Sequence, residues 1–302
     1  MFRLAHISDP HLGPLPQVSW RDLASKRVTG YVNWQRHRGK AMASPVLSQI
    51  IEELAAQKAD HLAITGDLVN LGLEAEVENA RAWLDSCGAP GDVSVVPGNH
   101  DAYVPGALAR ACKAWQPFMS GDTPPISAAP ADMFPFLRVR GQLAIIGLSS
   151  AIATSPFLAR GAFRSDQAGR LAQILDDCGR RGVFRVILIH HPPVRGAAAL
   201  HKRLFGIGLF QKTVAQHGAE LVLHGHTHLA TVNFIQGRDG RVPVVGVSSA
   251  SQTPGSHRPA AGCNIFEISG KPGAWRCDLQ HRSMTEMSAS MAATAPMQLL
   301  PG

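Results

Sequence analysis

Short apolar runs alternate with longer amphipathic stretches through the first three quarters of the chain. The apolar runs have strand length and lie at residues 2–7, 61–65, 93–96, 186–189 and 221–224. Amphipathic stretches with helical period lie between them, at residues 45–58, 74–86, 165–180 and 202–216. Alternation of strand and helix predicts parallel strands joined by right-handed crossovers.

The pattern changes to pure β after residue 228. Period-two runs bounded by turn residues predict strands at 231–235, 242–247, 264–268 and 274–279, in addition to a hairpin at 136–139 and 143–148. The proline-rich stretch from 105 to 135 predicts one helix near 107–115 and then an irregular loop over the site. A parallel half followed by antiparallel strands indicates an α/β fold of two packed sheets flanked by helices.

Polar side chains with metal-binding chemistry follow all five early strands. They are Asp9 and His11, Asp67, Asn99 with His100 and Asp101, His190 with His191, and His226 with His228. Because polar groups at the carboxyl ends of strands face a crevice, we expect them to line one site. Carboxylate, imidazole and amide donors form mixed N/O divalent sites. One or two from each strand end, namely Asp, His, Asp, Asn, His, His and His, already give seven ligands, which are too many for one tetrahedral ion. Two ions about 3.5–4 Å apart, bridged by a carboxylate, would clamp a phosphoryl group.

The ordered motifs D-x-H, G-D, G-N-H-D, a histidine after a strand, and G-H-x-H resemble the calcineurin-like metallophosphoesterases. The resemblance spans residues 9–228 and implies a four-layer α/β/β/α sandwich of two mixed sheets. It implies that Asp9, His11 and His228 bind one metal, that Asn99, His190 and His226 bind the other, and that Asp67 bridges them. His100 would stabilise the phosphoryl oxygen or protonate the leaving group, so the implied catalytic residues are His100, Asp67 and Asn99.

These features predict a dinuclear metal-dependent hydrolase of phosphate esters that uses a metal-bridging hydroxide. The two divalent ions are Mn, Fe, Zn, Co or Ni, since N/O donors do not select among them. G-N-H-D combined with H-H-P-P is similar to bacterial cyclic-nucleotide and glycerophosphodiester hydrolases, which favours a diester, with a phospholipid head group as a further possibility. The alternatives are a phosphomonoesterase or nuclease of the same superfamily, and a metal-bound interaction scaffold without turnover.

Other polar residues beside the motifs have structural explanations. His6, His191 and His224 are expected to support the ligands rather than to bind metal. Asp101 is expected either to orient His100 or to cap the following helix, and the sequence does not choose between these roles.

Composition limits the partners and the compartment. The chain has 302 residues, a net charge of +7 and a pI near 9.5, which favours anionic partners but equally fits a solvated basic surface. No obligate nucleic acid follows from this charge, and the oligomeric state cannot be read from it. Five widely spaced cysteines argue against a disulfide framework. No signal segment and no apolar run of about 18 residues is present, so we expect a cytoplasmic protein.

We expect a single catalytic domain at residues 1–282, a lid-like insertion at 14–43 and a flexible C-terminal tail at 283–302. The insertion carries Trp20, Tyr31 and Trp34 among basic residues, and short helices broken near Thr29 and Gly30 fit its spacing. One hypothesis is that residues 20–40 meet an anionic membrane surface, which would make the protein peripheral at its inner face. The other is that the aromatics pack the insertion onto the domain.

Overall fold

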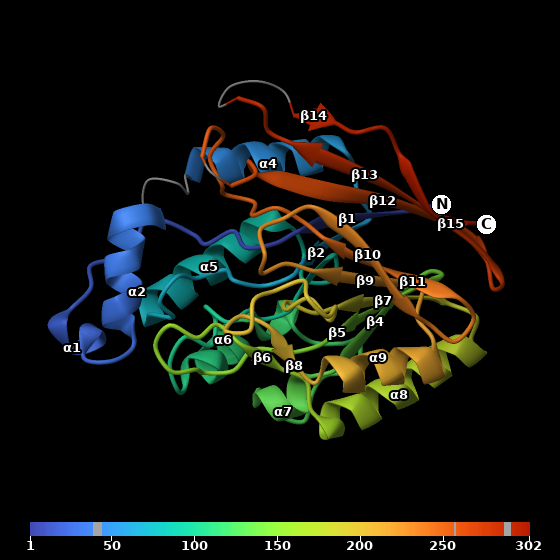
Figure 1. Cartoon of the computed structure of the whole chain (residues 1–302), viewed down its shortest axis with the longest axis horizontal. Coiled ribbons are helices and arrows are strands. Elements are labelled where there is room, and N and C mark those ends of the chain that lie inside the picture. The colour runs from blue at the N-terminus through green and yellow to red at the C-terminus, as the bar shows by residue number, and fades with distance from the viewer. Residues whose placement is uncertain (39–43, 257, 287–290) are drawn as a thin grey trace.

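Two mixed β-sheets form the centre of the computed structural model, which describes residues 1–38, 44–256, 258–286 and 291–302 (Figure 1). The first sheet has the order β14-β13-β12-β1-β2-β3, with β15 also paired to β13. Its strands are β1 (Phe2–Ile7), β2 (His61–Ile64), β3 (Val93–Val95), β12 (Gly262–Lys271), β13 (Ala274–Ser283), β14 (Ala292–Ala293) and β15 (Met297–Pro301). Strands β1, β2 and β3 run parallel, and β12 joins β1 antiparallel.

The second sheet has the order β10-β11-β9-β7-β5-β4. Its strands are β4 (Phe136–Arg140), β5 (Leu143–Gly147), β7 (Phe184–Leu188), β9 (Leu221–His224), β10 (Thr231–Gln236) and β11 (Arg241–Gly246). Strands β5, β7, β9 and β11 are parallel, and β4 and β10 close the edges antiparallel. A separate short pair joins β6 (Gly161–Ala162) to β8 (Leu204–Phe205).

Helices cover the outer faces of the sheets. Figure 1 shows α4 beside β12 and β13, and α8 with α9 at the opposite side of the molecule. The helices are α1 (Trp20–Leu23), α2 (Arg27–Asn33), α4 (Ser44–Ala56), α5 (Glu74–Cys87), α6 (Ala107–Trp115), α7 (Pro130–Met133), α8 (Ser165–Arg180) and α9 (Ile207–His217), with a π-helical turn η1 (Trp34–Arg38) and a 3-10 turn η2 (Gln116–Phe118). No helix among these residues combines the length and apolar character needed to cross a membrane.

Alternation along β7 explains why the sheets stack. Val186 and Leu188 belong to the large core, which also holds Leu4 and Ile7 of β1. Ile187, between them in sequence, belongs to a second core with residues of α8 and α9. Because successive strand residues point to opposite faces, the sheet is buried both by the other sheet and by its helices. The predicted mixed α/β fold with two sheets is confirmed.

Two expectations about helices differ from the structure. Helix α2 runs through Thr29 and Gly30, so the break in the insertion lies instead at residues 24–26. Helix α9 begins at Ile207, later than the predicted 202, because Gly206 has φ +90° and passes close to the carbonyl of Phe163.

The end of the chain is not wholly the flexible tail expected for 283–302. Met297–Pro301 forms β15 and pairs with β13, so these backbone groups extend the first sheet. The stretch lacks a clear period, and only the exposed edge of β13 decides that it becomes a strand. Residues 287–290 of the predicted tail and 39–43 of the predicted insertion lie outside the described residues.

Candidate metal centre

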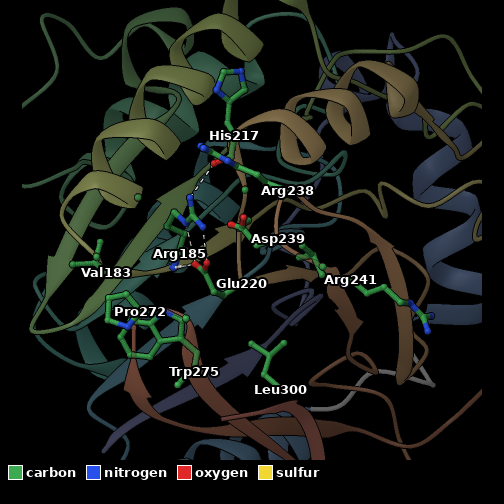
Figure 2. Close-up of a pocket in the computed structure, with 18 of the residues that line it drawn as sticks. Val183, Arg185, His217, Glu220, Arg238, Asp239, Arg241, Pro272, Trp275 and Leu300 are labelled. Carbon is green, nitrogen blue, oxygen red and sulfur yellow. Dashed lines mark hydrogen bonds and ion pairs between the residues drawn. The ribbon is translucent and has the colours of Figure 1, made fainter.

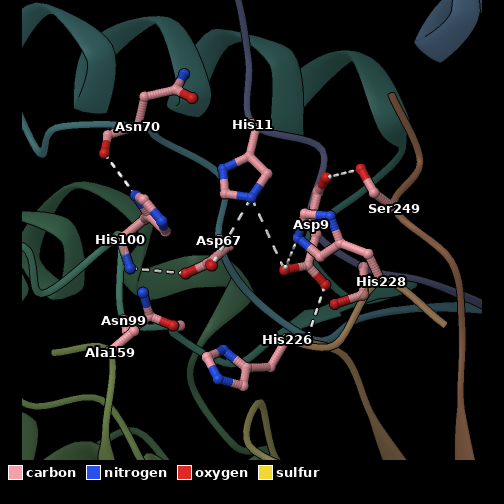
Figure 3. A network of polar contacts seen from close by, with 12 residues as sticks. Asp9, His11, Asp67, Asn70, Asn99, His100, Ala159, His226, His228 and Ser249 are labelled. Atoms are coloured by element: carbon pink, nitrogen blue, oxygen red, sulfur yellow. Dashed lines mark hydrogen bonds and ion pairs between the residues drawn. The ribbon is translucent and has the colours of Figure 1, made fainter. Parts of the chain in front are cut away.

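The five early strands end at one place, between the carboxyl edges of the two sheets (Figure 3). Strands β1, β2 and β3 of the first sheet deliver Asp9 with His11, Asp67, and Asn99. The second sheet delivers His190 from β7 and the histidine pair after β9. The sheets are held together here by hydrogen bonds that cross between them, such as His226 N to Asp9 Oδ2 at 2.9 Å.

Asp9, His11 and His228 form one buried cluster of possible ligands. His228 Nε2 lies 3.1 Å from Asp9 Oδ1, and His11 Nε2 lies 3.9 Å from the same oxygen. Burial alone would raise the pKa of Asp9, but His228 outweighs it and holds this pKa below its ordinary value. The carboxyl group is therefore an anion beside two imidazoles, which is a suitable half of a cation site.

His190, Asn99 and His226 form the neighbouring cluster. His190 Nε2 lies 3.3 Å from Asn99 Oδ1, and the His190 and His226 rings are 5.1 Å apart. His190 Nδ1 donates to Thr65 O at 2.6 Å, and His226 Nε2 donates to Lys202 O at 2.9 Å. These carbonyls fix the ring tautomers, so Nε2 of His190 and Nδ1 of His226 are the atoms available to a metal.

Asp67 lies between the two clusters. Its Oδ2 is 3.8 Å from His11 Nε2 and 3.4 Å from His190 Nε2. Burial would raise the pKa of Asp67, but His190 and then His100 lower it well below the ordinary value. Conversely, burial would lower the pKa of His190, and Asp67 raises it to about 9. Asp67 is thus a charged carboxylate whose one oxygen is close to donors of both clusters.

The residues fit a pair of cations by a further test. Asp9 Oδ1 is fully buried, and within the described residues it accepts no hydrogen bond of good geometry, although His228 Nε2 lies 3.1 Å away. A buried carboxylate oxygen without a well-aligned donor is costly, and a cation at this position would remove that cost. Oxygen and imidazole donors without thiolate are the ligand set of Mn, Fe, Zn, Co or Ni sites.

Backbone conformation concentrates at the same residues. Five of the seven predicted ligands, namely Asp9, His11, Asp67, His226 and His228, have φ between +40° and +67°. This left-handed region is unfavourable for residues with a Cβ, and such strained residues are typical of functional sites. The strain is therefore located where the chain must aim its ligands.

Close backbone packing also depends on glycine at two positions. A Cβ on Gly98 would lie 2.2 Å from Asp67 Oδ1, and a Cβ on Gly225 would lie 2.5 Å from Asp9 Oδ2. Both glycines come from the G-N-H-D and G-H-x-H motifs. They allow the backbone to approach a ligand carboxylate where any other residue would collide with it.

Asp101 has a role that neither sequence interpretation included. Its carboxylate accepts the backbone N–H groups of Asp67, Leu68, Val69 and Gly98 at 2.8 to 3.2 Å. It therefore neither orients His100 nor caps a helix, but shapes the loop that carries Asp67. Burial and then the charge of Asp67 raise the pKa of Asp101 to about 7, while the N–H donors oppose this rise.

His100 lies beside the two clusters rather than within them. Its backbone N–H donates to Asp67 Oδ1 at 2.7 Å, and its Nδ1 donates to Asn70 O at 2.6 Å. A carbonyl can only accept, so Nδ1 carries a proton and Nε2 is the other nitrogen at which a proton can be exchanged. Its ring is stacked on Tyr103 with 5.4 Å between centroids and 22° between planes.

The model of the calcineurin-like phosphoesterase family matches residues 2–230. The chain belongs to this family. The match covers every strand that delivers a predicted ligand, and the family depends on a pair of metal ions. The chain is also 28% identical, over 282 residues, to a protein of Synechococcus sp. described as a probable cyclic nucleotide phosphodiesterase, with 91% of each protein covered.

Solved structures of other proteins share the fold at low sequence identity. A dimetal phosphatase from Danio rerio is 14% identical, with a TM-score of 0.57 and coverage of 100% of this chain and 99% of that one. A purple acid phosphatase from yellow lupin (Lupinus luteus) seeds is 11% identical, with a TM-score of 0.61, and is covered over 54% of its length. These likenesses support the calcineurin-like fold.

The remaining histidines of the site support the candidate ligands. Both ring nitrogens of His191 are within hydrogen-bonding distance of protein oxygens, Nδ1 at 2.8 Å from Ser150 Oγ and Nε2 at 3.2 Å from Ala159 O. Burial and then the charge of His190 lower the pKa of His191 to about 3, so it stays neutral. His6 Nε2 lies 2.9 Å from Thr65 Oγ1. The carbonyl of Thr65 accepts a hydrogen bond from His190, so His6 contacts the residue that orients this candidate ligand.

The insertion packs on the domain through basic residues. Arg27 donates to Leu71 O at 2.9 Å and to Gly72 O at 2.7 Å. Lys26 donates to Thr154 Oγ1 at 2.7 Å and to Leu158 O at 3.0 Å. Tyr31 packs on a small apolar cluster that contains Tyr103, whereas Trp20 is 74% exposed. Lys40, one of the basic residues of the membrane hypothesis, lies outside the described residues.

A groove of about 620 Å³ lies at the other edge of the sheets (Figure 2). Arg185 and Glu220, near the amino ends of β7 and β9, line it, as do Arg238 and Asp239. The guanidinium of Arg185 is bound by both Glu220 oxygens and by His217 O, at 2.5 to 3.0 Å. The ion pair is thus saturated within the protein, and it joins the strands rather than offering a charged group to a ligand.

Proposed function

We propose that this protein is a dinuclear metal-dependent phosphodiesterase. One ion would be held by Asp9, His11 and His228, the other by Asn99, His190 and His226, and Asp67 would be shared. The position of Asp67 Oδ2 between His11 Nε2 and His190 Nε2 is the observation that carries this proposal. When bound, the ions would activate a water molecule and stabilise charge on the phosphoryl oxygens.

The residues of the chain would perform the remaining steps. Asp67 and Asp9 are negatively charged and would repel the anionic phosphate of a diester. Their charge must therefore be neutralised before the substrate binds. His100 is fixed through Nδ1 by Asn70 O and through its backbone by Asp67 Oδ1. We propose that its Nε2–H protonates the oxygen of the leaving group.

A phosphate diester is the proposed substrate class. The similarity to a probable cyclic nucleotide phosphodiesterase over 91% of both chains supports it, as does the combination of G-N-H-D with H-H-P-P. Cyclic nucleotides, glycerophosphodiesters and phospholipid head groups share this chemistry.

The test compares turnover of bis-p-nitrophenyl phosphate and p-nitrophenyl phosphate by metal-free protein to which Mn²⁺ is added back. We expect Mn²⁺-dependent turnover and a kcat/KM for the diester above that for the monoester. A higher kcat/KM for the monoester would make the protein a phosphomonoesterase. No turnover of either compound with Mn²⁺, Fe²⁺, Zn²⁺, Co²⁺ or Ni²⁺ would leave the metal-bound scaffold as the better description.

A further inference from the structure

Tyr103 connects the insertion to His100. Its ring is stacked on the His100 ring, and the Lys26 ammonium lies 4.7 Å from the centroid of the same Tyr103 ring. We infer that Tyr103 and Lys26 are positioning residues for His100, and that the insertion thereby holds the leaving-group acid in its working orientation. This inference rests on the proposed function, in which His100 protonates the leaving oxygen.

The stacked Tyr103 ring restrains the His100 ring in a direction that the bond from Nδ1 does not. The bond from Nδ1 to Asn70 O fixes one nitrogen, but rotation about that bond still moves Nε2. A flat neighbour 22° from parallel limits that rotation. The His11 ring, whose centroid lies 4.8 Å away and whose plane is nearly perpendicular to that of His100, limits it further. The ring plane is therefore set by packing, and Nε2 is aimed as a consequence.

Tyr103 is itself fixed by the domain and by the insertion. It is 7% exposed and packs in a small cluster with Leu71, Val104 and Ala107. Helix α2 reaches the ring at Gly30, where a Cβ would lie only 2.2 Å from Tyr103 Oη. Only glycine allows the helix backbone this close to the ring, so the contact between α2 and Tyr103 is built into the sequence.

Lys26 secures the arrangement from the start of α2. Its ammonium is hydrogen bonded to Thr154 Oγ1 and Leu158 O while it lies over the Tyr103 ring. Burial lowers the pKa of Lys26 to about 8, as expected for an ammonium drawn out of water. Because these bonds direct the ammonium into the protein, Lys26 acts through Tyr103 rather than as an anchor for a distant anion.

The chemical step explains what misalignment would change. The oxygen of water bonds to phosphorus, the bond from phosphorus to the leaving oxygen breaks, and that oxygen takes the electron pair. His100 in its imidazolium form gives its Nε2 proton to this oxygen and keeps its Nδ1 proton, and the proton released by water returns to Nε2 through solvent. A nitrophenolate can leave without this proton, whereas a phenolate of higher basicity needs it more. Displacing Nε2 should therefore slow poor leaving groups selectively.

The experiment compares kcat for bis-p-nitrophenyl phosphate and diphenyl phosphate, which differ in leaving group but little in shape. In Tyr103→Leu we expect kcat for diphenyl phosphate to fall about tenfold more than kcat for the nitrophenyl diester. Lys26→Met should show the same selectivity to a smaller extent. Tyr103→Phe, which keeps the ring, should restore the ratio, and Val28→Ala, on the exposed side of α2, should leave it unchanged.

A second measurement uses metal-free protein. Proton–nitrogen spectra of the imidazoles should show the His100 Nδ1–H signal at one position in wild type and Tyr103→Phe, and shifted or broadened in Tyr103→Leu. Equal loss of kcat for both diesters, with an unchanged Nδ1–H signal, would overturn the inference and leave a purely structural contact. Wild-type protein that hydrolyses neither diester with added metal would instead refute the proposed function.

Discussion

Asp67 is the residue on which the proposed centre depends most. A terminal ligand serves one ion, whereas Asp67 Oδ2 lies within 3.8 Å of ligand nitrogens of both clusters. Loss of a residue that only supports a metal ligand lowers activity by up to about 100-fold. We expect Asp67→Ala to lower kcat/KM by more than this, and by more than His228→Ala does. Kinetics combined with metal analysis check this. Activity of Asp67→Ala within a few-fold of wild type would contradict the proposal that Asp67 is shared by two ions.

Asp101 has a comparable importance for the stability of the loop. Replacement by Asn places an amide NH₂ where a carboxylate oxygen now accepts two backbone N–H groups. We expect Asp101→Asn to reduce the free energy of unfolding of the metal-free protein by about 2–3 kcal/mol, because buried donors lose their acceptor. Urea unfolding measures the change. The exposed Asp166→Asn serves as control and should stay within about 0.5 kcal/mol of wild type.

At the scale of an element, the basic residues of the insertion from α1 to η1 fall into two groups, those that contact the domain and those that are exposed. Lys26 and Arg27 are bound to the domain, which leaves Arg21 and Arg36 as its exposed, described basic residues. At about 1 kcal/mol for each basic residue near an anionic surface, these two supply about 2 kcal/mol, and Arg38 and Lys40, whose side chains the structure does not describe, would bring the sum to at most about 4 kcal/mol. We therefore expect no co-sedimentation with phosphatidylserine vesicles at about 0.15 M salt, because salt at this concentration strongly screens surface charges. Binding that is lost in Trp20→Ala/Trp34→Ala would instead support the membrane hypothesis.

At the scale of the whole molecule, the proposed metal centre would connect the two sheets, because its ligand residues come from both of them. Metal binding should thus stabilise the native state. At 100 times its dissociation constant, a metal that binds only the folded chain adds about 2.7 kcal/mol, which corresponds to about 4 °C in Tm for a chain of 302 residues. Calorimetry with and without Mn²⁺ tests this. His100→Ala should keep the shift and Asp67→Ala should lose most of it, while an unchanged Tm in wild type would contradict a centre shared by the sheets.

Much of the fold and the proposed site was accessible from sequence, for a local reason. A buried strand followed at once by Asp, Asn or His is a short-range pattern, and the alternation of strands and helices sends such strand ends to one edge. The seven candidate ligands, which the ordered motifs and their resemblance to the metallophosphoesterases implied, are all close together in the structure. Their assignment to two ions remains a proposal.

Long-range contacts decided the rest. The role of Asp101 depends on four N–H groups, three of them more than thirty residues away, and the strand at Met297–Pro301 depends on an open edge of β13. The link from Lys26 through Tyr103 to His100 joins positions with no shared motif. The sequence by itself determined which donors are present and at which strand ends, because both are local properties. Only the tertiary structure decided which groups orient them, since orientation comes from packing between distant segments.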